Sequence, residues 1–135
     1  EMDLSAFNAH DLDRIGEIHD PDVIVYMGFM PVDQLTRGHD PDHVAELQFL
    51  WDQFDMKIPE HTIVFGHGEW TAGVSITTGR FAKPITTADG VVHQPNDKTF
   101  TIQVATLDKW KDERIVEEYI YWDQDAIYRQ LGLYD

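Results

Sequence analysis

The apolar residues of the chain follow a helical spacing in two segments of its first half. In residues 11–18, an aspartate that suits a helix N-cap precedes apolar residues at intervals of three, namely Leu12, Ile15 and Ile18. Residues 40–54 open with Asp-Pro, a favourable helix start, and carry one apolar stripe, made of Val44, Leu47, Leu50, Trp51 and Phe54. The pattern predicts a short helix over 11–18 and the longest helix of the chain over 40–54.

Alternation with a period of two predicts β-strands over most of the remaining chain. The β-branched and aromatic run at 23–29 is typical of a strand. Further alternating segments cover 61–70, 71–81, 99–110 and 115–122. The connection at 82–98 is rich in turn residues and could hold a small hairpin at its Asp-Gly pair. Helices followed by a meander of antiparallel strands indicate an α+β fold, with helices covering one face of a curved sheet.

The last predicted strand carries large side chains on both of its faces. Alternation places Val116, Glu118, Ile120 and Trp122 on one face, and Glu117, Tyr119 and Tyr121 on the other. Neither set is typical of a solvent-exposed face, so we expect the helices to cover one and a partner subunit to cover the other. After this strand, Asp123 suits the N-cap of a short closing helix, and Gly132 suits its end.

Composition and charge narrow the range of functions. The chain has 135 residues, which suits a single domain over 1–135, and its 42% hydrophobic content argues against disorder. A formal net charge of -15 disfavours binding to nucleic acid or to anionic membrane surfaces. The absence of cysteine excludes a disulfide framework and a thiolate nucleophile. No apolar run is long enough for a membrane span, so we expect a cytoplasmic protein.

Four stretches together have the character of one known family. They are SAFN at 5–8, HDPD at 19–22, TRGHDPDHVAEL at 36–47 and ERIVEEYIYWDQDAIYRQLGL at 113–133. In these stretches the chain resembles the SnoaL-like polyketide cyclases, a family of the nuclear-transport-factor-two-like superfamily. The resemblance implies a cone-shaped curved antiparallel sheet wrapped by N-terminal helices, with a deep apolar cavity between them. It also implies a homodimer through the outer sheet face and no metal or organic cofactor.

The resemblance also implies where catalytic groups should stand. In the family's anthracycline cyclases, an Asp on the last strand is the acid/base of an intramolecular aldol ring closure, and a His on the preceding strand assists. When the RQLG endings are matched, these positions fall on Ile120 and Thr106, so both acid/base groups are absent from this chain. We expect both residues to line the cavity, together with Trp51, Phe54 and Trp122.

Three other residues are candidates for the chemistry. Glu118 lies two residues before Ile120 on the same strand face, and a carboxylate between apolar neighbours could act as a general base; alternatively it is a solvated or Arg-paired carboxylate at the cavity mouth. His67 could form an acid/base pair with Glu69, although the flanking glycines favour a bend that would expose both. Tyr26 could donate a phenolic hydrogen bond to a carbonyl or enolate.

These observations leave three functions open. The first is a cofactor-independent small-molecule enzyme that moves a proton next to a carbonyl of an apolar substrate, with Glu118 as base and His67 or Tyr26 as helper. The second is a non-catalytic carrier of an apolar metabolite, which the isoleucine at position 120 favours. The third is a dimeric interaction module whose own side chains fill the cavity. The sequence contains no phosphate loop, dinucleotide fingerprint or nucleophile elbow.

Overall fold

The protein is an α+β structure, as the sequence predicts. A computed structural model describes residues 8, 9, 11–28, 36, 37, 48, 51–87 and 89–133. Its elements in chain order are α2 (Leu12–Ile18), β1 (His19–Met27), β2 (Thr36–Arg37), β3 (Lys57–His67), β4 (Trp70–Arg80), β5 (Ile85–Thr86), β6 (Val92–His93), β7 (Thr99–Lys111), β8 (Arg114–Tyr121) and α4 (Gln124–Gln130). Of the helix predicted over 40–54, residues 48 and 51–54 are helical, and the others lie outside the described residues.

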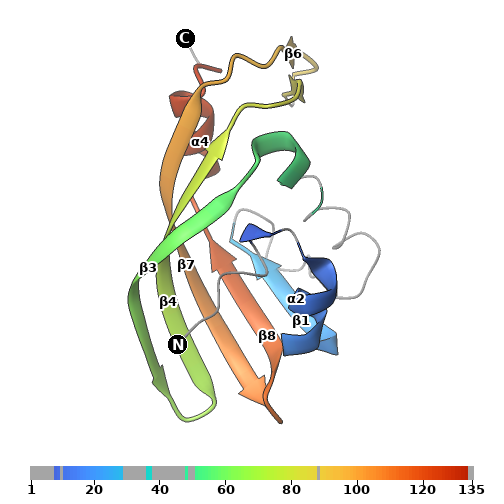
Figure 1. Cartoon of the computed structure of the whole chain (residues 1–135), viewed down its shortest axis with the longest axis vertical. Helices are drawn as coiled ribbons and strands as arrows, with labels where there is room; N and C mark the ends of the chain where they lie inside the picture. Colours follow the sequence, from blue (N-terminus) through green and yellow to red (C-terminus); the bar gives the residue numbers. More distant parts are fainter. Residues whose placement is uncertain are drawn as a thin grey trace.

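One curved sheet of six strands dominates the structure (Figure 1). The strand order is β2-β1-β8-β7-β4-β3, and a separate two-stranded sheet joins β5 to β6. The antiparallel meander predicted from the alternation is confirmed for β3, β4, β7 and β8. The pairing of β1 with β8 is instead parallel. These two strands come from opposite ends of the chain, so no local turn determines their relative direction.

Short turns with left-handed backbone connect the long strands. Between β7 and β8, Asp112 and Glu113 have φ values of 51° and 64°, the conformation that a two-residue hairpin requires. Gly90, with a φ of 83°, lies in the hairpin between β5 and β6, which confirms the small hairpin predicted there. Gly68, with a φ of 60°, follows β3. The turn positions were therefore readable from the sequence.

The larger core cluster lies where α4 packs against the sheet. α4 begins at the predicted cap, since the Asp123 carboxylate accepts a hydrogen bond from the Ala126 backbone N–H at 3.1 Å. Gly132, with a φ of 75°, follows the helix as predicted. The buried members of the cluster are Trp51, Phe54, Met56, Phe81, Ile85, Phe100, Ile102, Ile127 and Leu131. They come from the helical segment at 51–54, from β5 and β7, from α4 and from the segments that flank them, so this cluster holds one end of the sheet.

A smaller core cluster lies toward the other end of the sheet, beside α2. Its buried members are Val23, Val25, Met27 and Ile115, from β1 and β8. The Asp11 carboxylate caps α2 through the Arg14 N–H, so the helix predicted over 11–18 is confirmed. Trp122 packs against both clusters and thereby links the two ends.

Helices pack against one face of the sheet, whereas the other face carries exposed apolar side chains. We call the face that packs against α2 and α4 the inner face; it carries Phe100 and Ile102 of β7. The opposite, outer face carries several exposed apolar side chains, namely Ile63, Phe65, Trp70, Leu107 and Tyr121. Figure 1 shows α2 beside β1 and β8, and α4 at the far end of the sheet. Among the described residues, no helix is long and apolar enough to cross a membrane.

Candidate active site

Three titratable side chains meet near the α2 end of the inner face. His19 lies at the junction of α2 and β1, Asp108 on β7 and Glu118 on β8. Asp108 and Glu118 are directly opposite each other in the β7–β8 register, which brings their Cβ atoms to roughly 4.5–5.5 Å. We call these three residues the inner-face cluster. Among the described residues, no group of His, Asp and Glu has a geometry that could hold a metal ion.

His19 joins the helix to the last strand through both ring nitrogens. Its Nε2 lies 2.8 Å from Oε2 of Glu118, and its Nδ1 lies 2.8 Å from the carbonyl oxygen of Ile15. Burial alone would lower the pKa of His19, but the hydrogen bond and the charge of Glu118, together with the Ile15 carbonyl, raise it above its usual value. The two side chains are 17% and 16% exposed, so this pair is shielded from water on most sides.

Asp108 is the most buried carboxylate of the cluster. It is 5% exposed, and its Oδ1 atom has no hydrogen-bond partner within the described part of the chain. Burial, and then the negative charge of Glu118, raise the pKa of Asp108 to about 7, while His19 acts in the opposite direction. Buried polar atoms are rarely left without a partner, and a carboxyl group that titrates near neutral pH is typical of a functional site.

Of the three catalytic candidates taken from the sequence, the structure places only Glu118 in this cluster. Tyr26 pairs with Tyr119 in the β1–β8 register and therefore lies on the outer face. Its ring stacks on that of Tyr119, with centroids 5.0 Å apart and planes inclined by 6°. The sheet itself separates Tyr26 from Glu118, because neighbouring residues of a strand point to opposite faces.

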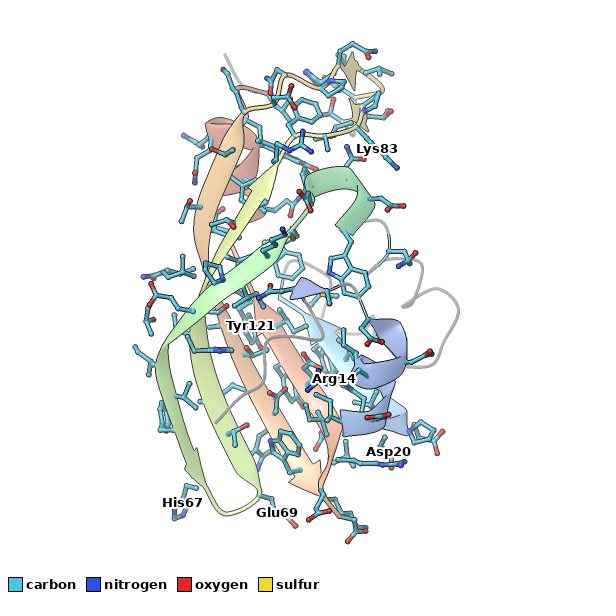
Figure 2. The ribbon with its side chains drawn as sticks, viewed as in Figure 1. Arg14, Asp20, His67, Glu69, Lys83 and Tyr121 are labelled. Atoms are coloured by element: carbon cyan, nitrogen blue, oxygen red, sulfur yellow. The ribbon has the colours of Figure 1, made fainter. Side chains whose placement is uncertain are left out.

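His67 and Glu69 lie at the tip of the β3–β4 hairpin. His67 is the last residue of β3 and Glu69 belongs to the turn, so the two do not share one regular strand. Both are exposed, and Figure 2 shows them at the tip of the hairpin, away from α2. The bend that the flanking glycines predicted is present, and it keeps His67 apart from Glu118.

The residues expected to line a cavity fall into two groups. Trp51 and Phe54 are each 2% exposed and belong to the larger core cluster. Thr106 and Ile120 are half-buried and oppose each other across β7 and β8 on the inner face. Trp122 links the two core clusters, and its Nε1–H donates to Oε1 of Gln124 at 2.8 Å. Thr106 and Ile120 therefore lie beside the inner-face cluster, whereas Trp51 and Phe54 contribute to the packing of the core.

The comparison with protein families supports the same reading of the fold. The family model described as SnoaL-like polyketide cyclase matches residues 2–131. The chain belongs to this family. Among proteins with curated descriptions, none matches it.

Several solved structures share the fold of this chain at low sequence identity. IdmH from Streptomyces antibioticus, described as a candidate polyketide cyclase, is 23% identical with a TM-score of 0.78, over 96% of this chain and 92% of its own. A SnoaL-like protein from Jannaschia sp. CCS1 is 18% identical with a TM-score of 0.77, over 98% and 88%. A ketosteroid isomerase-like protein from Catenulispora acidiphila, solved with trimethylamine, is 13% identical with a TM-score of 0.72, over 96% and 88%. At these identities the likeness shows the fold alone.

The inner-face cluster lies next to the positions that the SnoaL-like resemblance assigns to acid and base. Those positions, Ile120 on β8 and Thr106 on β7, form one cross-strand pair. The next pair on the same face of the same two strands is Asp108 with Glu118. Asp108 and Glu118 thus each lie two residues along their strand from Thr106 and Ile120, the positions that the SnoaL-like resemblance assigns to acid and base.

Asp108 and His19 were not identified from the sequence. Asp108 continues the alternation that puts Phe100 and Ile102 on the inner face, so its orientation was readable from the strand pattern. The HDPD stretch that contains His19 contributes to the family resemblance, but nothing in it indicates a functional role for the histidine. Its place beside Glu118 depends on the parallel pairing of β1 with β8, for which the local sequence carries no signal.

Proposed function

We propose that the protein is a cofactor-independent small-molecule enzyme that moves a proton next to a carbonyl group, and that the inner-face cluster carries this chemistry. The single observation behind the proposal is the buried Asp108 carboxyl group, with one unpartnered oxygen, opposite the His19–Glu118 pair. Groups that exchange a proton near neutral pH are the most effective acids and bases at that pH.

Membership of the SnoaL-like family supports this reading. The family's reaction needs one group that accepts and returns a proton beside a carbonyl, and it needs no metal. The side chains of Ile120 and Thr106 cannot act as that group here, whereas Asp108 and Glu118 can, and they lie on the same two strands and the same face. The acid/base function has therefore moved along the sheet in this chain.

We propose a neutral carbonyl compound as substrate, such as a cyclic ketone, a lactone or an aromatic polyketide. The described neighbours of Glu118 on the inner face are apolar: Val25 pairs with it across β1 and β8, and Ile120 is the next inner-face residue of β8. The chain as a whole has a formal net charge of -15, which disfavours an anionic substrate. Apolar walls with a few convergent polar groups are typical of small-molecule sites.

The exchange of α-hydrogens of such compounds with deuterium oxide tests the proposal. NMR would follow the loss of the α-proton signal with and without the enzyme, over a panel of ketones, lactones and aromatic polyketides. We expect Glu118→Gln to lower the enzymatic exchange, by less than loss of the base itself, because the variant removes a charge that tunes the cluster.

A neighbouring glutamate provides the matched control. Glu117 lies on the outer face, where its carboxylate accepts a hydrogen bond from Tyr119 at 3.2 Å and lies 3.4 Å from Nζ of Lys109. Glu117→Gln makes the same chemical change one residue away, and we expect it to leave exchange unchanged. Equal losses in the two variants would show that the inner-face cluster has no special role. Ligand-induced thermal stabilisation of the wild type without exchange would identify a carrier instead.

We also propose that two copies associate through the outer sheet face. Its exposed apolar side chains, among them Phe65, Leu107 and Tyr121, are available for contact, and the one ion pair described there, Lys109 with Glu117, has no net charge on a chain that otherwise carries -15. We expect Leu107→Asp to convert a dimer into a monomer in analytical ultracentrifugation. Val92→Asp, at a residue of β6 that is 54% exposed, places the same charge away from the sheet and should leave the dimer intact. A monomeric wild type would contradict the proposal.

A further inference from the structure

The position of one hydrogen in the inner-face cluster follows from elementary chemistry. His19 is the C-cap residue of α2, and the carbonyl of Ile15 is among the last four of that helix, which have no intrahelical partner. A carbonyl oxygen can only accept, so the 2.8 Å contact between it and Nδ1 of His19 requires a hydrogen on Nδ1. The end of the helix thereby fixes the state of this nitrogen.

The contact between His19 and Glu118 must then hold a second proton. The distance of 2.8 Å between Nε2 and Oε2 is that of a charge-assisted hydrogen bond. With Nδ1 already protonated, a neutral ring would present only a lone pair at Nε2, facing a carboxylate that is also an acceptor. The pair is therefore either an imidazolium with a carboxylate or a neutral imidazole with a carboxylic acid, and it carries one shared proton in both cases.

The surroundings decide between these two forms. In the ion-pair form, an imidazolium and a carboxylate 2.8 Å apart compensate each other's charge, so the limited water at their 17% and 16% exposed side chains is sufficient. Asp108, the third member of the cluster, is 5% exposed and, within the described part of the chain, forms no ion pair of its own. On β4, the residue opposite Asp108 is Thr71, which does not titrate. Among the described residues, the titratable groups that face Asp108 are thus His19, from the α2–β1 junction, and Glu118, from β8.

We propose that His19 is the positioning residue of the cluster: it holds Glu118 as a carboxylate, so that Asp108 is the group that gains and loses the proton. This inference rests on the proton-transfer function proposed above for its role in turnover. In that step the Asp108 carboxylate takes a proton from the carbon beside a carbonyl. The electron pair of the C–H bond forms the C=C bond of an enolate, and the π pair of the carbonyl moves to its oxygen. Asp108 then returns a proton, or in deuterium oxide a deuteron, to the carbon.

Two variants separate this assignment from a merely structural role. His19→Gln retains a side-chain N–H donor for Glu118 but cannot carry a positive charge. His93→Gln, in the β5–β6 hairpin, makes the same replacement outside the cluster. NMR titration of protein labelled with ¹³C at its carboxyl groups and with ¹⁵N in its imidazoles, between about pH 4 and about pH 9, would follow each group.

In the wild type we expect His19 with hydrogens on both ring nitrogens, an ionised Glu118 and a protonated Asp108 on the acidic side of neutrality. In His19→Gln we expect the pKa of Asp108 to rise further, because the charge of His19 opposes that rise in the wild type, and in His93→Gln we expect no change in the cluster. A wild type with a neutral His19 ring and a protonated Glu118 at neutral pH would overturn the proposal. An Asp108 that is already ionised at mildly acidic pH would overturn it as well.

The α-hydrogen exchange assay gives the second measurement. We expect Asp108→Asn to lower kcat by on the order of 10²-fold or more, as for the loss of a general base. We expect His19→Gln to shift the midpoint of the pH profile of kcat while leaving KM unchanged. Full exchange by Asp108→Asn would overturn the proposal. If the wild type exchanges none of the compounds, the proposed function fails, and the titration alone still decides where the proton lies.

Discussion

Replacing Phe100 with alanine should lower the free energy of unfolding by about 3–5 kcal/mol, the usual loss for a large aromatic side chain in a core. Phe100 is 1% exposed, and its ring meets that of Phe54 edge to face, with centroids 5.6 Å apart. The ring also covers Gly79 of β4, where a Cβ atom would lie 2.3 Å from Cζ of Phe100. Alanine would therefore leave a cavity between β4, β7 and the helical segment at 51–54, which the backbone can close only in part.

Phe65 offers the matched control for this prediction. It is 66% exposed on β3, so Phe65→Ala removes the same atoms at a position where they make little contact with the core. We expect its effect on the unfolding free energy of the monomer to stay within about 0.5 kcal/mol. Urea denaturation followed by tryptophan fluorescence would measure both variants in the Leu107→Asp background, in which the protein is expected to be a monomer. Similar losses at the two positions would mean that the larger core cluster is not the main source of stability at this end of the sheet.

Much of the fold was readable from the sequence because local rules determine it. The alternation of β7 places Phe100 on one face without any knowledge of its partners, and the caps of α2 and α4 depend on single aspartates, Asp11 and Asp123. Hairpin turns follow from residues that tolerate a left-handed backbone, as at Gly90. In each case the structural outcome depends on residues only a few positions apart.

The candidate site was only partly readable because it depends on contacts between distant segments. Glu118 could be assigned to the inner face from its spacing to Ile120. His19 lies 99 positions from Glu118 and reaches it through a parallel strand pair, whose direction and register no turn specifies. Asp108 had a readable orientation, but its depth of burial depends on how α2 and β8 pack around it. Local patterns predict which way a side chain points, whereas its electrostatic surroundings are a property of the assembled fold.

The pH dependence of stability should reveal the proton on Asp108. Its pKa rises from 3.8 to about 7 on folding, chiefly because the carboxyl group is buried and then because Glu118 is charged. The folded state therefore binds this proton more tightly than the unfolded chain does between these two values. Its stabilising contribution is complete below about pH 4 and disappears as the pH rises through about 7. His19, whose pKa is also raised, changes stability in the same direction above its usual value of 6.5.

Asp108→Asn removes this titration while keeping nearly the same shape. A pKa difference of one corresponds to 1.36 kcal/mol, and the pKa of Asp108 rises from 3.8 to about 7. We therefore expect the free energy of unfolding of the wild type to fall by up to about 4 kcal/mol relative to the variant as the pH rises from about 4 to about 8. Urea denaturation of both proteins across this range measures the difference, in which the titrations of groups outside the inner-face cluster cancel. Glu118→Gln should reduce the loss without abolishing it, since burial is the larger cause and the charge of Glu118 the smaller. If the free energies of unfolding of the wild type and Asp108→Asn change in parallel with pH, Asp108 binds its proton equally well in the folded and unfolded chain. Another group of the inner face would then have to be the base of the proposed reaction.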